Sequence, residues 1–128
     1  MKMLLDTQAF LWSMSDFSKL TKKARAALVN PENDVYLSLA SIWELAIKIS
    51  TGKLRIAGSL EKLIPEQLAL NNITQLDIAF RHVVGVGSLP YHHKDPFDRL
   101  LVSQATLEGM PILSADKAFD AYGIKRVW

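Results

Sequence analysis

A chain of 128 residues is long enough for one domain and too short for two of ordinary size, so we expect a single domain over residues 1–128. Hydrophobic residues make up 49% and charged residues 22%, which excludes a disordered chain, and the net charge of +2 by itself indicates no particular partner. The absence of cysteine excludes thiol catalysis and cysteine-ligated zinc or iron–sulfur sites, and it fits a reducing, cytoplasmic location. Asp6 interrupts the first apolar run early, so we expect no signal peptide and no membrane span.

The first half of the chain predicts short apolar strands that alternate with helices. In chain order these are a strand at 3–5, helices at 7–14 and 22–28, a strand at 34–37, and helices at 41–49 and 59–70. Because proline lacks the amide N–H that a helix interior needs, we expect Pro65 to divide the last of these helices into two pieces.

The second half continues the alternation. It predicts a strand at 73–76, a helix at 77–84, a loop at 85–93, a helix at 95–108, a strand at 111–113, a short helix at 116–122 and a strand at 124–128. Most of the strands lack polar alternation, which is typical of a parallel sheet covered on both faces. We therefore expect an α/β three-layer sandwich with a mainly parallel central sheet, whose ligands bind beyond the carboxyl ends of the strands.

Four acidic residues lie in predicted junction regions: Asp6, Glu44, Asp98 and Asp116. Three of them follow predicted strands, and Asp98 lies in the first turn of the helix that follows the loop at 85–93. A parallel sheet would bring these junctions to one edge, where several carboxylates repel one another unless a cation neutralises them. Mg²⁺ and Mn²⁺ prefer such oxygen ligands, and a cation held there can activate water and stabilise charge on a phosphodiester. If bound cations neutralised all four acids, 15 basic residues would stand against 9 acidic ones, a net charge of +6. Such a charge favours a polyanion as partner. Lysines scattered over solvated helix faces would give the same net charge without binding one.

Each acid taken alone also has a structural interpretation. Asp95 fits the N-cap of the helix that follows it, and Asp98 then lies in the first helical turn, where it favours the helix dipole. Ser41 and Glu44 match a capping box, and Asp116 can cap the helix that it introduces. A purely structural interpretation fits Asp6 least well, because a carboxylate at the end of an apolar strand is costly to bury without a partner.

Four longer motifs occur in order along nearly the whole chain: LLDTQAFLW at 4–12, SIWELAIK at 41–48, HKDPFDRLL at 93–101 and ILSADKAFDAYG at 112–123. Together they resemble the motifs of the PIN-domain family, and within it the VapC-like toxins of bacterial toxin–antitoxin pairs. The resemblance implies a PIN fold, RNA hydrolysis that depends on Mg²⁺ or Mn²⁺, and a toxin restrained by a partner antitoxin. It also implies a homodimer.

Carried over by motif, Asp6, Glu44 and Asp98 correspond to the family's acidic core, and Asp116 corresponds to its more variable fourth acid. The resemblance implies that Asp6 and Asp98 hold a cation directly and that Asp116 does so directly or through water. Glu44 then binds metal or orients the attacking water. Gln8 departs from the histidine or asparagine that often stands at this position in the family, and it is not one of the acidic ligands.

The remaining residues give weaker indications. Four side chains near Asp98 are candidates for phosphate contacts, namely His92, His93, Lys94 and Arg99, whereas His82 is interpreted as an ordinary helix residue. For Lys22, Lys23 and Arg25 a solvated helix face is the default, with an RNA-binding rim as the alternative. The apolar residues Phe10, Leu11, Trp12, Trp43 and Ile47 fit either the core or a groove for an antitoxin segment.

Other functions are less well supported by the residues. A phosphotransferase with Asp6 as nucleophile would commonly carry a second acid at position 8, where this chain has Gln8, and the chain has no phosphate-binding GxxxxGK[ST] loop. The alternative that stays open is a catalytically silent PIN-fold module that binds RNA or protein.

Overall fold

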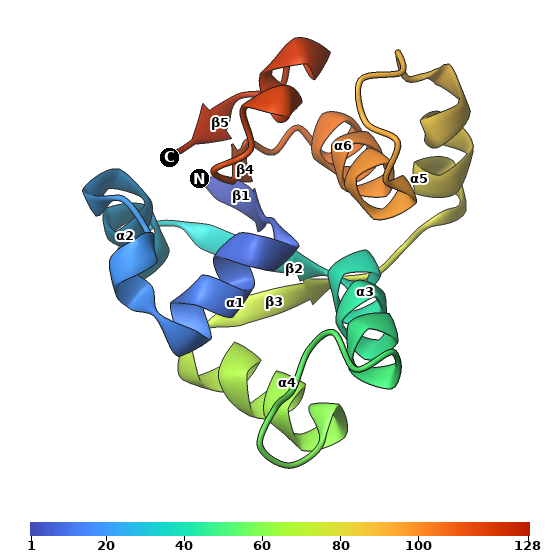
Figure 1. Ribbon diagram of the computed structural model, residues 1–128. Coiled ribbons are helices and arrows are strands. Elements are labelled where there is room, and N and C mark those ends of the chain that lie inside the picture. The colour runs from blue at the N-terminus through green and yellow to red at the C-terminus, as the bar shows by residue number, and fades with distance from the viewer.

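A five-stranded parallel sheet forms the centre of the molecule. The computed structural model describes residues 1–128, and the strands have the order β3-β2-β1-β4-β5, so β1 is central (Figure 1). Every neighbouring pair of strands is parallel. The strands are β1 (Lys2–Leu5), β2 (Asp34–Ser38), β3 (Ile73–Leu76), β4 (Ile112–Leu113) and β5 (Arg126–Val127).

Helices cover both faces of this sheet. The α-helices are α1 (Thr7–Ser15), α2 (Lys22–Val29), α3 (Leu39–Ser50), α4 (Leu60–Leu70), α5 (Phe80–Gly85) and α6 (Pro96–Glu108), and the short 3₁₀ helices are η1 (Phe17–Lys19), η2 (Val86–Ser88) and η3 (Lys117–Tyr122). On one face Met3 and Leu5 of β1 pack in a core with α1, α2 and α4, and on the other face Leu4 packs with α6 and η3. The predicted α/β three-layer sandwich is confirmed, and its sheet is parallel throughout.

Two predicted helix boundaries are wrong for local reasons. Helix α4 runs without a break through Pro65, which lies on the exposed side of the helix while Ile64 is buried in the core. Proline removes one hydrogen bond to the carbonyl of Glu61, and packing of the apolar face offsets that loss. Helix α5 begins at Phe80 rather than at 77, because the backbone N–H of Ala79 donates to Nδ1 of His82 at 2.9 Å and closes the first turn there.

The carboxyl-terminal elements are shorter than predicted. Strand β5 pairs only over Arg126–Val127, and the segment before it forms the 3₁₀ helix η3. The predicted loop at 85–93 contains the 3₁₀ helix η2. None of the helices is both long enough and apolar enough to cross a membrane.

The parallel register places the predicted acids near one another. Leu5 at the end of β1 is directly opposite Leu113 at the end of β4, so the residues that follow these two strands leave the sheet side by side. Strand β2, on the other side of β1, leads directly into α3. The carboxyl edge of the sheet is therefore where the chemistry predicted from the sequence is expected.

Candidate metal centre

A serine connects two of the predicted acids at the ends of β1 and β4. Asp6 is buried and caps α1, with its Oδ1 accepting from the backbone N–H of Ala9 at 2.7 Å. Its Oδ2 accepts from the hydroxyl of Ser114, and the Ser114 Oγ in turn accepts from the backbone N–H of Asp116 at 3.0 Å. Sequence reasoning did not single out Ser114, although its place directly after an apolar strand, two residues before Asp116, was a usable signal.

Asp98 enters from the first turn of α6. Asp95 is the N-cap of this helix and its Oδ1 accepts from the backbone N–H of Phe97 at 2.8 Å, so the capping role predicted for Asp95 is confirmed. Pro96 occupies the first helical position, where its missing N–H costs nothing. The sharp start of α6 fixes the position of Asp98 at the edge of the sheet.

Glu44 lies in the second turn of α3 and does not belong to a capping box. The helix begins at Leu39, because the Ser38 hydroxyl caps it by accepting from the backbone N–H of Ala40 at 3.0 Å. Ser41 instead accepts a hydrogen bond of 2.9 Å from Thr7, the residue after Asp6, and so ties α3 to α1. The capping interpretation of Glu44 is therefore wrong. Its carboxylate lies 3.1 Å from Nζ of Lys48.

The four acids influence one another's charge. Burial raises the pKa of Asp98 to about 7, and the charges of Asp95, Glu44 and Asp116 add to this while His93 opposes it. Burial also raises the pKa of Asp6; hydrogen bonds from Ser114 and Ala9 oppose the rise, and the charges of Asp116 and Glu44 reinforce it. The carboxyl edge thus holds more negative charge than the protein itself neutralises.

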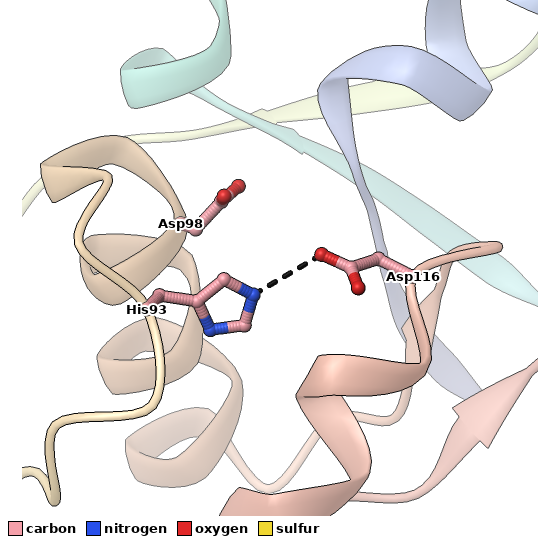
Figure 2. A group of neighbouring side chains, drawn as sticks. All are labelled: His93, Asp98 and Asp116. Atoms are coloured by element: carbon pink, nitrogen blue, oxygen red, sulfur yellow. Dashed lines mark hydrogen bonds and ion pairs between the residues drawn. The ribbon is translucent and has the colours of Figure 1, made fainter.

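His93 is the unexpected member of the site. Its ring is buried, and Nε2 lies 3.1 Å from Oδ2 of Asp116 (Figure 2). One ligand atom from each of His93, Asp98 and Asp116 lies within 4.8 Å of the others, a group that does not include Asp6 or Glu44. Burial by itself raises the pKa of Asp116, but hydrogen bonds from Ala118 and His93 and the charges of His93 and Arg126 outweigh it and lower the pKa.

Two of the predicted phosphate contacts are wrong. The His93 ring points at Asp116, and the buried guanidinium of Arg99 donates to the carbonyl oxygens of Pro90 at 3.0 Å and Val86 at 3.1 Å. Arg99 therefore holds the segment before α6 in place. His92 and Lys94 are exposed in that segment, and their predicted contact with phosphate stays a prediction.

The donor set fits a hard divalent cation. Carboxylate oxygens dominate it, as Mg²⁺ and Mn²⁺ require, and the raised pKa values of Asp6 and Asp98 show how unfavourable the unneutralised cluster is. Asp98 and Asp116 are the acids held closest together with His93, and Asp6 and Glu44 lie within electrostatic reach of them.

Comparison with known proteins now identifies the family. The model of the PIN domain family matches residues 3–125, nearly the whole chain. The chain belongs to the PIN-domain family. No curated protein sequence matches this PIN domain.

Three solved structures share the PIN fold. VapBC2 from Rickettsia felis, bound to a DNA fragment from its promoter, matches with a TM-score of 0.71 and 15% identity over 98% of this chain and 97% of that one. VapBC-1 from nontypeable Haemophilus influenzae matches with a TM-score of 0.66 and 17% identity, over 98% of this chain and 96% of that one. A toxin–antitoxin complex from Klebsiella pneumoniae matches with a TM-score of 0.56 and 20% identity, over 91% of this chain and 89% of that one. At these identities the likeness establishes the fold.

Proposed function

We propose that this PIN domain, acting as one unit over residues 1–128 in the cytoplasm, is an endoribonuclease dependent on Mg²⁺ or Mn²⁺ and the toxin of a toxin–antitoxin pair. One observation carries the proposal: the sheet edge gathers Asp6, Glu44, Asp98 and Asp116, and burial and mutual repulsion raise the pKa of two of them. Such a cluster is suited to binding a divalent cation and poorly suited to a purely structural role.

The roles of the residues follow from their surroundings. When bound, a divalent cation supplies charge neutralisation and Lewis acidity for the hydrolysis of a phosphodiester. Asp6 and Asp98 would hold it, with Asp116 as a further ligand directly or through water. The Ser114 hydroxyl fixes the orientation of Asp6, and Glu44 orients the attacking water and accepts its proton unless it serves as a ligand. Exposed His92 and Lys94 would contact RNA phosphates beside Asp98. The products would carry a 5′-phosphate and a 3′-hydroxyl.

A groove beside the site offers a place for an antitoxin segment. It has a volume of about 570 Å³, and its lining includes Leu11, Trp12, Leu54, Ile56 and Leu63 together with the basic residues Lys19, Lys48, Lys53 and Arg55. Lys48 also contacts Glu44, so one lining residue of the groove is paired with one of the four acids. A segment with apolar anchors and acidic neighbours would match this lining. Phe10 does not take part, because it is fully buried in the core.

We propose in addition that two copies of the chain associate. Helix α5 exposes Phe80, a residue that is 84% accessible, next to exposed Val83 and Val84. Contiguous apolar surface of this kind is characteristic of an interface. Sedimentation of the protein and of a Phe80→Lys variant checks this, and the variant is expected to be monomeric; a wild-type monomer contradicts the proposal.

The nuclease is tested with total cellular RNA. Purified protein is incubated with Mg²⁺, with Mn²⁺ and with a chelator, beside an Asp6→Asn variant and an Asp34→Asn control that removes an exposed acid at the opposite end of β2. We expect discrete cleavage by the wild type and the control, with 5′-phosphate ends, and none with the chelator or with Asp6→Asn.

Two outcomes would contradict the proposal. A folded, metal-bound protein without an antitoxin that cleaves no RNA favours the alternative, a catalytically silent PIN-fold module that binds RNA or protein. Cleavage that persists in Asp6→Asn and in chelator points to a contaminating nuclease or to another mechanism.

A further inference from the structure

A hydrogen-bonded chain leads from Tyr122 through His93 to Asp116. The backbone N–H of His93 donates to the Tyr122 hydroxyl oxygen at 2.8 Å, and that hydroxyl lies 3.1 Å from Nδ1 of the His93 ring. The oxygen accepts the backbone bond, and the hydroxyl proton can then be donated to Nδ1 when that nitrogen carries no proton of its own. The two rings are stacked, with centroids 5.4 Å apart and planes 11° from parallel.

This arrangement selects one tautomer of the His93 ring. An ionised carboxylate can only accept a hydrogen bond, so the ring nitrogen that faces Asp116, Nε2, carries a proton. A neutral imidazole has one donor and one acceptor nitrogen, so Nδ1 of the neutral ring then accepts from the Tyr122 hydroxyl. Nε2 lies 3.1 Å from Oδ2 of Asp116 and therefore donates to it. A protonated nitrogen has no lone pair for a metal, and hard cations in any case prefer oxygen to imidazole.

The same bond orients the carboxylate of Asp116. Its Oδ1 accepts from the backbone N–H of Ala118 at 2.9 Å and its Oδ2 accepts from His93, so one donor holds each oxygen. Two donors on opposite oxygens prevent rotation of the carboxylate and leave a lone pair on each oxygen for a cation or a water molecule. Without His93, only the bond to Ala118 would hold it.

We propose that His93 is a positioning residue of the candidate metal centre. The Asp116 carboxylate and the Tyr122 hydroxyl together select its tautomer, and His93 holds the Asp116 carboxylate for the cation without binding the cation itself. The inference rests on the proposed function, because it assumes that Asp116 serves a bound metal. It assigns a task to the two aromatic residues that the mechanism above does not use.

Two variants that both replace the ring with an amide side chain test the role of the Nε2 donor. In His93→Gln the amide nitrogen reaches about as far as Nε2 and can still donate to Asp116, whereas in His93→Asn the shorter side chain reaches only as far as Nδ1. Both lose the ring that stacks on Tyr122 and Phe119. Calorimetric titration with Mn²⁺ is expected to show affinity about 10- to 100-fold weaker than wild type for His93→Asn, and largely restored affinity for His93→Gln.

A second measurement keeps the intact ring. Long-range ¹H–¹⁵N correlation spectra of the metal-free protein are expected to show the Nε2-protonated tautomer for the His93 ring, assigned by the resonance that His93→Gln lacks. Adding Mg²⁺ should leave this tautomer unchanged. In Tyr122→Phe, which keeps the stacked ring and loses the hydroxyl, the selection of the tautomer should weaken.

Several results would overturn the inference. Equal Mn²⁺ affinities of the Gln and Asn variants would leave His93 with a packing role only. If both variants fail to fold, the spectra of the wild type still decide, because an Nδ1-protonated ring would contradict the hydrogen-bonded chain. Failure of the proposed function looks different, because the wild type itself would then neither bind Mn²⁺ nor cleave RNA.

Discussion

Two buried histidines of this chain make similar hydrogen bonds through their two ring nitrogens, but the charges around them differ. His82 in α5 accepts a bond on Nδ1 from Ala79 and places Nε2 3.0 Å from Oε1 of Glu108. His93 accepts on Nδ1 from Tyr122 and places Nε2 3.1 Å from Asp116. Both rings therefore use one nitrogen to fix the tautomer and the other to hold a carboxylate.

The carboxylates differ in what else surrounds them. Glu108 is in direct contact with the guanidinium of Arg81, so the cluster between α5 and α6 contains its own counter-charge. Asp116 faces a site with three further acids, of which Glu44 alone has a close lysine partner, Lys48. A histidine–carboxylate pair thus says little about function by itself. The charge left unbalanced around the pair is what distinguishes a structural cluster from a candidate metal centre.

The largest difference is expected in metal affinity. Asp116→Asn and Glu108→Gln each remove one negative charge next to a buried histidine and change the shape little. Asp116→Asn should weaken Mn²⁺ binding at least about 10-fold, and Glu108→Gln should leave it unchanged, because only the first acid belongs to the site. Calorimetric titration measures both. An equal effect of the two substitutions would remove the distinction between the clusters.

A smaller effect is expected on stability, and it depends on pH. The pKa of Asp98 is about 7 in the folded protein against an ordinary value of 3.8, so between these values the folded state holds a proton that the unfolded state has lost. The titration of Asp98 therefore lowers the free energy of unfolding of the metal-free protein as the pH rises from about 4 to 7. At pH 8 Asp98→Asn should be more stable than the wild type by on the order of 2 kcal/mol, a value reduced for partial exposure of Asp98.

Thermal unfolding in chelator at several pH values measures this gain. The gain should be mostly lost near pH 4, where the aspartate is protonated in the folded state and a large fraction is also protonated in the unfolded state. Glu108→Gln is the matched control, and it should not reproduce the gain. A variant that is less stable than the wild type at pH 8 would show that Asp98 makes a structural contact that outweighs its burial.

The smallest effect is expected at the outer part of the structural cluster. Arg81 is more than half exposed, and exposed ion pairs contribute roughly 0–1 kcal/mol. Arg81→Ala should therefore lower the free energy of unfolding in urea by no more than about 1 kcal/mol and leave Mn²⁺ affinity unchanged. A larger loss would mean that the counter-charge of Arg81 is essential for keeping Glu108 and His82 together.

Much of the architecture could be predicted from the sequence, because local pattern and tertiary structure agree there. Apolar runs such as Met3–Leu5 are buried strands, and the Asp95-Pro96 start of α6 has the cap that its residues indicate. Asp6, Glu44 and Asp116 could be predicted to lie near one another, because a parallel sheet brings the ends of its strands to one edge. Asp98 follows a loop, so the resemblance of its motif was the stronger signal for its place.

The remaining features depend on contacts between distant residues. Ser114 contacts Asp6 across 108 positions, and Tyr122 contacts His93 across 29, separations at which no local pattern exists. Glu44 matched a capping box in its residues, but the preceding Ser38 starts the helix earlier, at the end of β2. Arg99 had the charge of a phosphate ligand, and only the fold shows that backbone carbonyls occupy it.

The bond between Ser114 and Asp6 also has a consequence for the order in which the site can form during synthesis. Asp6 is synthesised long before its partner Ser114, which follows it by 108 positions and lies directly after β4. A growing chain can therefore build α1 to α4 against β1, β2 and β3 while its carboxyl edge still lacks Ser114, Asp116 and Tyr122. A nascent or truncated chain that ends before β4 has no assembled centre, so the candidate metal centre can form only after β4 and η3 have been made.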